Sequence, residues 1–274
     1  MDLSVVIVNY NTRDLLRDCL NSLEKQNGLQ FEVIVIDNAS VDGSAAMVRE
    51  HFPNVRLLEQ TRNQWFCGGN NIGIEAALGR YVLLLNPDTV VTDGALAQMV
   101  TFMDTHPDYA GVTAQMRYPD GTIQRTCSRV PTYRYLLLNH TPLGWLLPQV
   151  KRRLAARHWY AEWDRTTDKD IEVMPGSCTL MRREDIKLDD QLLLYFPEDD
   201  LSRRINGKRR FLASAVIMHY EKAATQSWLA TRVYFQDMLH YVRVHHGITA
   251  ALLLRLLTRP LLWGMWLKRA LMHQ

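Results

Sequence analysis

Short apolar runs alternate with amphipathic segments over the first part of the chain. Leu3–Val8, Phe31–Ile36 and Tyr81–Leu85 are rich in Val, Ile and Leu, which is typical of strands covered on both faces. Between the first two runs, apolar residues recur at helical spacing: Leu15, Leu16, Cys19, Leu20 and Leu23. A strand, a helix and a second strand in this order predict a parallel pair with a right-handed crossover. The pattern therefore predicts an α/β fold.

Further elements follow by the same criteria. The sequence predicts helices over Ala45–His51, Ile72–Leu78 and Asp93–Thr105, and strands over Val55–Leu58, Gly111–Met116 and Ala215–Lys222. A Pro-Asp-Gly turn predicts a hairpin over Tyr118–Arg125, which would be exposed.

Polar residues follow the buried runs directly. Asp37 comes after the second run, and Asp88 comes after the third, where Pro87 lacks the N–H needed to continue a strand ladder. Ligands bind at the carboxyl edge of open α/β sheets. Asp37 would accept a hydrogen bond from a base or sugar there, and Asp88 suits Mg²⁺ or Mn²⁺ bound to a substrate phosphate.

Composition narrows the class of protein. The chain has 274 residues, 47% of them hydrophobic and 22% charged, which predicts a globular protein. The net charge of +3 is too small to favour nucleic acid, so we expect no such partner. The four cysteines form no CxxC pair, which favours a reducing, cytoplasmic location over a zinc site or disulfide framework. We expect neither a secretory signal nor a transmembrane helix, since no 18-residue apolar stretch is free of charge.

Four segments in order carry a family resemblance: Val5–Asn11, Asp37–Ser44, Asn63–Gly73 and Leu84–Thr89. Together they resemble the inverting glycosyltransferases of family 2, in the bacterial rhamnosyltransferase-like branch, over residues 2–222. The resemblance implies a GT-A fold, which is a Rossmann-like mixed sheet with helices on both faces. It also implies Mg²⁺ or Mn²⁺ and a dTDP- or UDP-linked sugar donor, with dTDP-rhamnose expected.

The resemblance assigns residues to the nucleotide. Asp37 resembles the aspartate that binds the base, and Asn9 and Asn38 lie in the adjoining segments. The Gly68-Gly69 pair would let backbone approach the ligand. The remaining predicted contacts of this segment are Asn63, Gly69 and Asn70.

The resemblance also assigns a metal and diphosphate site. Asp88 resembles the last carboxylate of the family's DxD motif, whose first position is Asn86 here. His219 resembles the histidine of a Val-x-His segment that reaches the metal or the diphosphate. Asp88 and His219 are therefore the predicted metal ligands, and Lys222 would offset diphosphate charge.

On the acceptor side, two segments resemble the same branch. Gln124 and Arg125 belong to a PDG-x-x-Q hairpin and would face the donor or acceptor, or be neutral surface residues. Gly176 and Ser177 belong to a segment that borders the acceptor pocket, with Ser177 where alanine is usual.

The sequence Pro197-Glu198-Asp199-Asp200-Leu201 concentrates three carboxylates at a helix start, and at least one should have a raised pKa if the site is dry. Inverting transfer needs a general base, which the family places in Glu-Asp-x-Asp-Leu. Alignment on Asp-Leu makes Glu198 the base, and alignment on Glu-Asp makes it Asp199. We favour Asp199, because that keeps the Glu-Asp pair, with Glu198 as the alternative.

The sequence divides into a catalytic domain, 1–224, and an amphipathic helical tail, 225–274. Residues 131–170 form an insertion in which basic and aromatic residues are interleaved. The insertion would contact a membrane surface or a lipid-diphosphate acceptor, or be an ordinary helical excursion. The tail combines Trp263 and Trp266 with Arg255 and Arg259, which favours a helix lying on a membrane over one crossing it.

These features predict a metal-dependent inverting glycosyltransferase, peripheral on the inner face of the cytoplasmic membrane. It would pass rhamnose to a saccharide or lipid-linked acceptor in surface polysaccharide synthesis, such as that of O-antigen. A nucleotidyltransferase is an alternative, but its Gly-rich loop after the first strand is absent. A non-catalytic binding module derived from a transferase is the other alternative, which the altered 197–200 segment favours.

Overall fold

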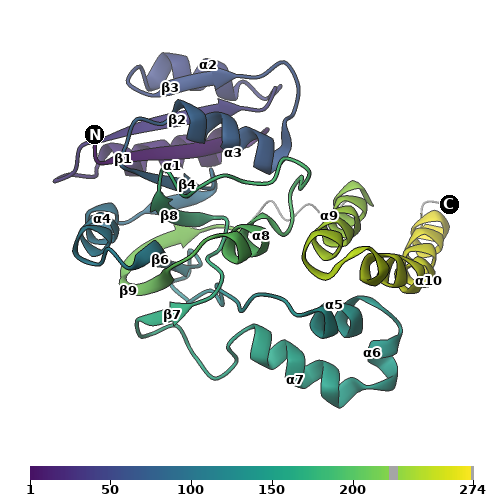
Figure 1. Ribbon diagram of the computed structural model, residues 1–274. Coiled ribbons are helices and arrows are strands. Elements are labelled where there is room, and N and C mark those ends of the chain that lie inside the picture. Colours follow the sequence, from purple (N-terminus) through teal and green to yellow (C-terminus); the bar gives the residue numbers. More distant parts are fainter. Residues whose placement is uncertain (222–227, 273–274) are drawn as a thin grey trace.

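The computed structural model describes residues 1–221 and 228–272. Helices cover both faces of one mixed sheet (Figure 1). The elements in chain order are β1 (Leu3–Asn9), α1 (Arg13–Glu24), β2 (Phe31–Asp37), α2 (Ser44–His51), β3 (Arg56–Glu59), α3 (Trp65–Ala76), β4 (Tyr81–Leu85), β5 (Thr89–Val91), α4 (Ala95–Thr105), β6 (Tyr109–Arg117), α5 (Tyr133–His140), α6 (Leu143–Leu146), α7 (Pro148–His158), β7 (Lys169–Ile171), β8 (Cys178–Arg182), α8 (Pro197–Arg204), β9 (Lys208–His219), α9 (Trp228–His246) and α10 (Ile248–Met272).

The strand order is β3-β2-β1-β4-β8-β6-β9-β5, with β7 paired to β9. Strands β3, β2, β1 and β4 are parallel, and β8 is antiparallel to both β4 and β6. Since β6 and β9 are parallel to each other, the carboxyl ends of β1, β2, β4, β6 and β9 meet at one edge, together with the start of β8. In the β1–β2 register, Asn9 lies opposite Asp37. The predicted ligand edge is therefore present.

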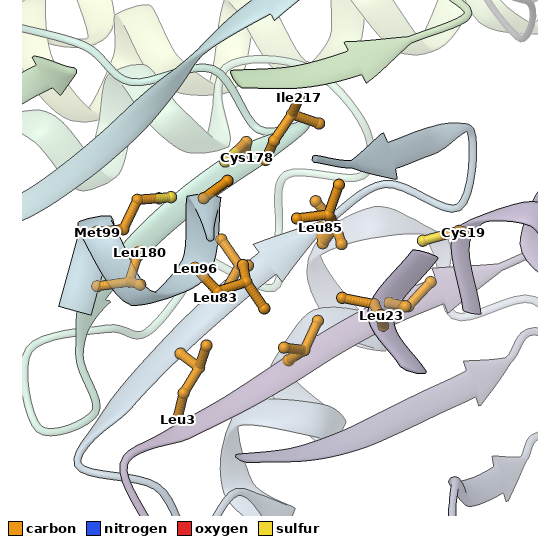
Figure 2. Packing of buried hydrophobic residues seen from close by; sticks show 14 of the residues in the cluster. Leu3, Cys19, Leu23, Leu83, Leu85, Leu96, Met99, Cys178, Leu180 and Ile217 are labelled. Atoms are coloured by element: carbon orange, nitrogen blue, oxygen red, sulfur yellow. The ribbon is translucent and has the colours of Figure 1, made fainter. Parts of the chain in front are cut away.

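Alternation along the central strands separates two apolar cores. Leu3, Val5 and Ile7 of β1 point to the face covered by α1, α2 and α4, whereas Val6 points to the face covered by α3, α8 and α9. Figure 2 shows the first core, where Leu23 of α1 and Leu96 of α4 approach the central strands. Burial on both faces explains the near-continuous apolar runs in the sequence.

Helix α3 corrects one prediction. It begins at Trp65 rather than Ile72, so the glycine-rich segment lies within the helix instead of forming a loop beside the ligand. A Cβ on Gly69 would come within 2.8 Å of the Val8 side chain, and one on Gly73 would overlap Val6 and lie 2.7 Å from Ile36. These glycines therefore let α3 pack closely on β1 and β2, and the prediction that they precede the helix is wrong. The predicted contact of Gly69 with a ligand stays a prediction.

The second half of the sheet also differs from the prediction. Strand β5, which was not expected, pairs antiparallel with β9, and β9 begins at Lys208 rather than near Ala215. The predicted hairpin is reduced to a bridge between Arg117 and Ile123 around Gly121, whose φ is +85°. Strand β5 is three residues long, too short for a periodic signal in the sequence.

The insertion and the tail form the part of the molecule farthest from β3 (Figure 1). Helix α9 contributes Met238, Tyr241 and Val242 to the second core. By contrast, Ile248–Trp266 of α10 is only 11% buried and is, in the part of the chain described, the one stretch long and apolar enough to span a membrane by length and composition, with a mean hydropathy of 1.3. The expectation that no segment spans a membrane stays a prediction.

Candidate active site

The nucleotide end of the edge is a buried hydrogen-bond network. Asn9 Nδ2 donates to Asp37 Oδ1 at 2.8 Å, and the backbone N–H of Ser40 donates to Asp37 Oδ2 at 3.0 Å. Thr12 Oγ1 donates to Asn9 Oδ1 at 2.6 Å, which orients the Asn9 amide. The Asp37 carboxylate is thus held at the end of β2, with spare lone pairs for the N–H or O–H of a ligand.

Three predicted asparagines shape this loop. The Asn38 amide donates to Trp65 O at 3.0 Å, and Asn63 Oδ1 accepts from Trp65 N at 2.8 Å. The Asn70 amide donates to Phe66 O at 2.8 Å, within α3. These contacts fix the start of α3 against β2, so the three side chains position backbone at this edge.

Asp88 and His219 are brought together at the other half of the edge. Both side chains are largely buried, and His219 Nε2 lies 3.4 Å from Asp88 Oδ1. The pairing of β5 with β9 places Thr89 opposite His219, and the backbone N–H of Tyr220 donates to Asp88 O at 2.9 Å.

Gln124 orients this histidine. Its Nε2 donates to the His219 carbonyl at 2.7 Å, which requires that Gln124 Oε1 face His219 Nδ1, at 2.9 Å. A carbonyl oxygen only accepts, so Nδ1 carries a proton, and Nε2 is the ring nitrogen that could bind a ligand. The prediction that Gln124 is an exposed hairpin residue is wrong, because it is buried beneath His219.

The pair fits a divalent cation. The carboxylate is a ligand for Mg²⁺ or Mn²⁺, and an imidazole with an oriented second nitrogen suits a transition metal such as Mn²⁺ better than Mg²⁺. Substrate phosphates commonly complete such a site. Within residues 1–221 and 228–272, no cluster of three or more His, Cys, Asp or Glu side chains forms a self-sufficient metal site. A metal here would therefore depend on the nucleotide as well as on Asp88 and His219.

Gly176 and Ser177, in the turn before β8, contact both the Asp88 turn and the first turn of α8. Asn86 N donates to Ser177 O at 3.1 Å, so the Ser177 backbone lies beside the Asn86-Pro87-Asp88 turn. The Ser177 hydroxyl donates to Met116 Sδ at 3.2 Å and is buried, so it is turned into the protein. A Cβ on Gly176 would overlap the Glu198 carboxylate, which explains a glycine at this position.

Glu198 and Asp199 lie in the first turn of α8 and have different surroundings. Glu198 accepts a backbone hydrogen bond from Gly176 and lines a small apolar space with Phe66, Leu84 and Met174. Burial raises the pKa of Glu198 to about 7. Burial also raises the pKa of Asp199 well above its usual range, with the neighbouring Glu198 charge adding to it. The prediction of at least one raised carboxyl pKa is confirmed.

Asp199 faces aromatic side chains. Burial raises the pKa of Tyr135, Tyr234 and Tyr241, and the charge of Asp199 adds to the rise in each. Asp199 Oδ1 is buried and has no hydrogen-bond partner among the residues described. An unpaired buried carboxylate oxygen is energetically costly. Asp199 is therefore a candidate for contact with a ligand.

Asp200 completes the cluster in a structural role. Its carboxylate contacts Arg204 Nε at 2.7 Å and His245 Nε2 at 2.8 Å. Asp200 therefore has two side-chain partners, whereas no ion pair is formed by Glu198 or Asp199 among the described residues.

Of the two remaining predicted residues, only one is described, and it is not joined to the site. Arg125 is exposed and makes no hydrogen bond or ion pair with another described residue. Lys222 lies outside the described residues.

Sequence reasoning missed Asp237 of α9. This carboxylate is fully buried, and its Oδ2 accepts from the backbone N–H groups of Leu193, Leu194 and Tyr195 at 3.1, 2.9 and 2.9 Å. It thereby holds the turn that leads through Phe196, at φ +66°, into α8. The available signal was an acidic residue between Val233 and Met238 on an otherwise apolar helix face.

The protein-family model described as Glycosyl transferase family 2 matches residues 4–188. The chain belongs to this glycosyltransferase family. A similar protein is the N-acetylglucosaminyl-diphospho-decaprenol L-rhamnosyltransferase of Mycobacterium tuberculosis (strain ATCC 25618 / H37Rv), with 25% identity over 269 residues, or 90% of this chain and 82% of the relative. The uncharacterized glycosyltransferase YibD of Escherichia coli (strain K12) is 39% identical over 176 residues, covering 62% of this chain and 49% of YibD. The predicted membership of family 2 is confirmed.

Solved structures share the fold at lower identity. GalNAc-T7 with UDP, GalNAc and Mn²⁺ matches 89% of this glycosyltransferase and 48% of its own chain, with a TM-score of 0.62 and 17% identity. The mannosyltransferase PcManGT from Pyrobaculum calidifontis, in complex with GDP-Man and Mn²⁺, matches 88% of this chain and 61% of its own, with a TM-score of 0.56 and 18% identity. The predicted GT-A fold is therefore confirmed.

Proposed function

We propose that this glycosyltransferase moves a sugar, with inversion, from a nucleotide diphosphate to an acceptor hydroxyl, with Asp199 as the general base. The observation that carries the proposal is the buried Oδ1 of Asp199, which has no hydrogen-bond partner among the described residues. The neighbouring Glu198 contacts Gly176, and Ser177 O accepts from Asn86 N in the turn that carries Asp88. A general base needs a free lone pair, which the unpaired Oδ1 of Asp199 supplies, and burial raises the pKa of this carboxyl.

The proposed transfer forms one bond at the anomeric carbon and breaks another. The acceptor oxygen bonds to the anomeric carbon while its proton passes to a carboxylate oxygen of Asp199. The bond between the anomeric carbon and the diphosphate oxygen breaks on the opposite face, and the electron pair leaves with the nucleoside diphosphate. Asp37, oriented by Asn9, would hold the nucleotide base. Asp88 and His219 would hold Mg²⁺ or Mn²⁺. When bound, the metal ion would neutralise the negative charge of the leaving diphosphate.

Glu198 is the alternative base. Its pKa of about 7 also suits proton transfer near neutral pH. However, Glu198 already accepts a hydrogen bond from the Gly176 backbone and faces an apolar space of about 10 Å³, too small for a sugar. These surroundings favour Asp199.

We further propose rhamnose from dTDP-rhamnose as the transferred sugar and a lipid-linked saccharide as the acceptor. The mycobacterial relative is named as an L-rhamnosyltransferase acting on a diphospho-decaprenol, and the match spans 90% of this chain. Other similar proteins are named for wall polymers, including the poly(ribitol-phosphate) β-N-acetylglucosaminyltransferase TarS of Staphylococcus aureus. These names support a role in surface polysaccharide synthesis such as that of O-antigen.

The distribution of exposed apolar residues supports work at the inner face of the cytoplasmic membrane. On α6 and the residue after it, Trp145, Leu146 and Leu147 are exposed, and α7 next to them carries Arg152 and Arg153. On α10, the exposed large apolar residues are Ile248, Leu252, Leu253, Leu256, Trp263, Met265 and Trp266. Aromatic and aliphatic side chains with adjoining arginines are typical of helices lying in a membrane interface.

The experiment is a panel of nucleotide sugars incubated with the purified protein and Mn²⁺ or Mg²⁺, with and without a membrane extract. We expect release of nucleoside diphosphate from dTDP-rhamnose, stimulated by the extract, and a product whose anomeric configuration by NMR is opposite to that of the donor. Release from another donor would overturn the sugar assignment. Retention of configuration would overturn the single-base mechanism.

A further inference from the structure

A groove runs between α9, α10 and the loop that precedes α8. Its volume is about 590 Å³, within the range of small-molecule sites. The loop contributes Asp190, Gln191 and Leu193, α9 contributes Arg243 among others, and α10 contributes Arg255. No part of the donor site lines it, so it is separate from the edge that carries Asp37 and Asp88.

The charge in the groove is positive. Arg243 Nη2 donates to Gln191 Oε1 at 3.3 Å and lies 3.1 Å from His240 Nδ1, but it forms no ion pair with a described carboxylate. Arg255 is exposed and likewise has no ion-pair partner in residues 1–221 and 228–272. Asp189 pairs with His240 at 2.7 Å. Asp190 lines the groove and accepts from the neutral Asn71 amide, so it keeps its negative charge but pairs with neither arginine. Two guanidinium groups are thus left to bind an anion, and Arg suits phosphate.

The rest of the groove is apolar and leads outward. Leu239 of α9 and Ile248, Ala251 and Leu252 of α10 line it. Leu252 is 57% exposed, and the exposed residues Leu253 and Leu256 continue the apolar surface along α10. A ligand with an anionic head group and an isoprenoid chain fits a groove in which arginines are followed by apolar residues.

The loop wall of the groove contacts residues next to the candidate active site. Leu193 lines the groove, and its carbonyl accepts from the backbone N–H of Phe66 at 2.9 Å. Phe66 in turn lines the small space against Glu198. The loop that forms one wall of the groove continues directly into α8, which carries Asp199. One continuous segment, from the groove residue Asp190 to the proposed base Asp199, therefore joins the groove to the candidate active site.

We propose that this groove binds the diphosphate and the first isoprenoid units of a lipid-linked acceptor. The proposal rests on the proposed function for its acceptor class. The diphosphate contacts Arg243 and Arg255, and the chain follows Ile248 and Leu252 along α10 to the membrane surface.

The test measures binding of farnesyl diphosphate to the full chain by calorimetry, with saturating nucleoside diphosphate to occupy the donor edge. The variant is Arg243→Gln with Arg255→Gln. The matched control is Arg259→Gln, an exposed arginine one turn farther along α10 that does not line the groove. We expect the double variant to weaken binding at least about tenfold, because two charge-assisted contacts are lost, and the control to bind as the wild type does.

Three results would overturn the proposal. Equal weakening in Arg259→Gln would mean general charge attraction. Equally tight binding of inorganic pyrophosphate would mean a plain anion site. Binding of anionic phosphatidylglycerol vesicles that needs the two arginines, without binding of farnesyl diphosphate, would mean a head-group contact of the membrane. Nucleoside diphosphate binding in a separate titration reports on the proposed function independently, so failure of the donor site and failure of the groove are distinguishable.

Discussion

Three consecutive carboxylates in α8 differ in their partners, and the partners decide their chemistry. Asp200 is paired with Arg204 and hydrogen-bonded to His245, whereas Glu198 and Asp199 are half-buried and form no ion pair with a described residue. Burial favours the protonated form of a carboxyl, and it raises the pKa of both Glu198 and Asp199.

A first prediction concerns Glu198 and stability. Its pKa in the folded protein, about 7, is above the ordinary 4.5, so this group stabilises the fold most below the ordinary pKa and loses that contribution as pH rises through the folded pKa. The shift corresponds to about 3 kcal/mol. In Glu198→Gln, urea unfolding should therefore show less loss of stability between about pH 5 and pH 8 than in wild type.

The control for that comparison is Glu184→Gln, an exposed glutamate, which should retain the wild-type pH dependence. An unchanged pH dependence in Glu198→Gln would mean that this carboxyl is not buried as described.

At the residue scale, the sequence predicted which polar side chains lie near the ends of strands, at the edge of the sheet. Asp37, Asp88 and His219 directly follow or end a strand, so their place at the sheet edge follows from topology. Gln124 was a predicted site residue, but its contact with His219 was not predicted, because 95 residues of chain separate the two. Asp237 was missed for the same reason, since it acts across about 43 residues, and local patterns do not encode such contacts.

At the scale of elements, α9 is a structural part of the catalytic site. Its Asp237 binds three successive backbone N–H groups of the loop before α8, and its His245 pairs with Asp200. The helix thus holds both ends of the segment that carries Glu198 and Asp199.

A second prediction follows for Asp237. In Asp237→Ala, three buried N–H groups lose their acceptor, and we expect the free energy of unfolding to fall by about 3 kcal/mol and sugar transfer to fall with it. Asp237→Asn keeps one acceptor oxygen and should lose less of both. Urea unfolding and initial transfer rates check this order, and equal stability of the two variants would contradict it.

The elements themselves were mostly predictable, and the misplaced boundaries have physical causes. Helix α3 was placed too late because glycines inside a helix resemble a loop in sequence, yet Gly69 and Gly73 are there for close packing on the sheet. Strand β5 owes its conformation to pairing with β9, a tertiary contact.

At the scale of the whole molecule, the helices of the insertion and the tail gather on one side of the transferase fold (Figure 1). Their composition predicted helices and an apolar, basic surface. It did not predict that α9 enters the core while α10 stays exposed, since both helices carry apolar residues at helical spacing.

A third prediction tests the membrane face. The variant Leu256→Ser with Trp263→Ser removes two exposed side chains of α10 and should weaken sedimentation with phosphatidylglycerol vesicles at least about tenfold, because membrane burial of each is worth roughly 1.5–3 kcal/mol. Binding should also weaken with added salt, since the arginines contribute through screened attraction.

The matched control is Leu78→Ser, an equally exposed leucine between α3 and β4, which should bind vesicles as the wild type does. Vesicle binding that survives the double variant would place the membrane contact elsewhere.

The most direct test of the whole account compares Asp88→Ala with Asp199→Asn in two assays: nucleoside diphosphate affinity by calorimetry with Mn²⁺, and the rate of sugar transfer. We predict that Asp88→Ala loses at least about tenfold in affinity, and that Asp199→Asn binds nucleotide normally but transfers at least about a hundredfold more slowly. Wild-type transfer by Asp199→Asn, or transfer lost in Glu198→Gln alone, would contradict the assignment of Asp199 as the base.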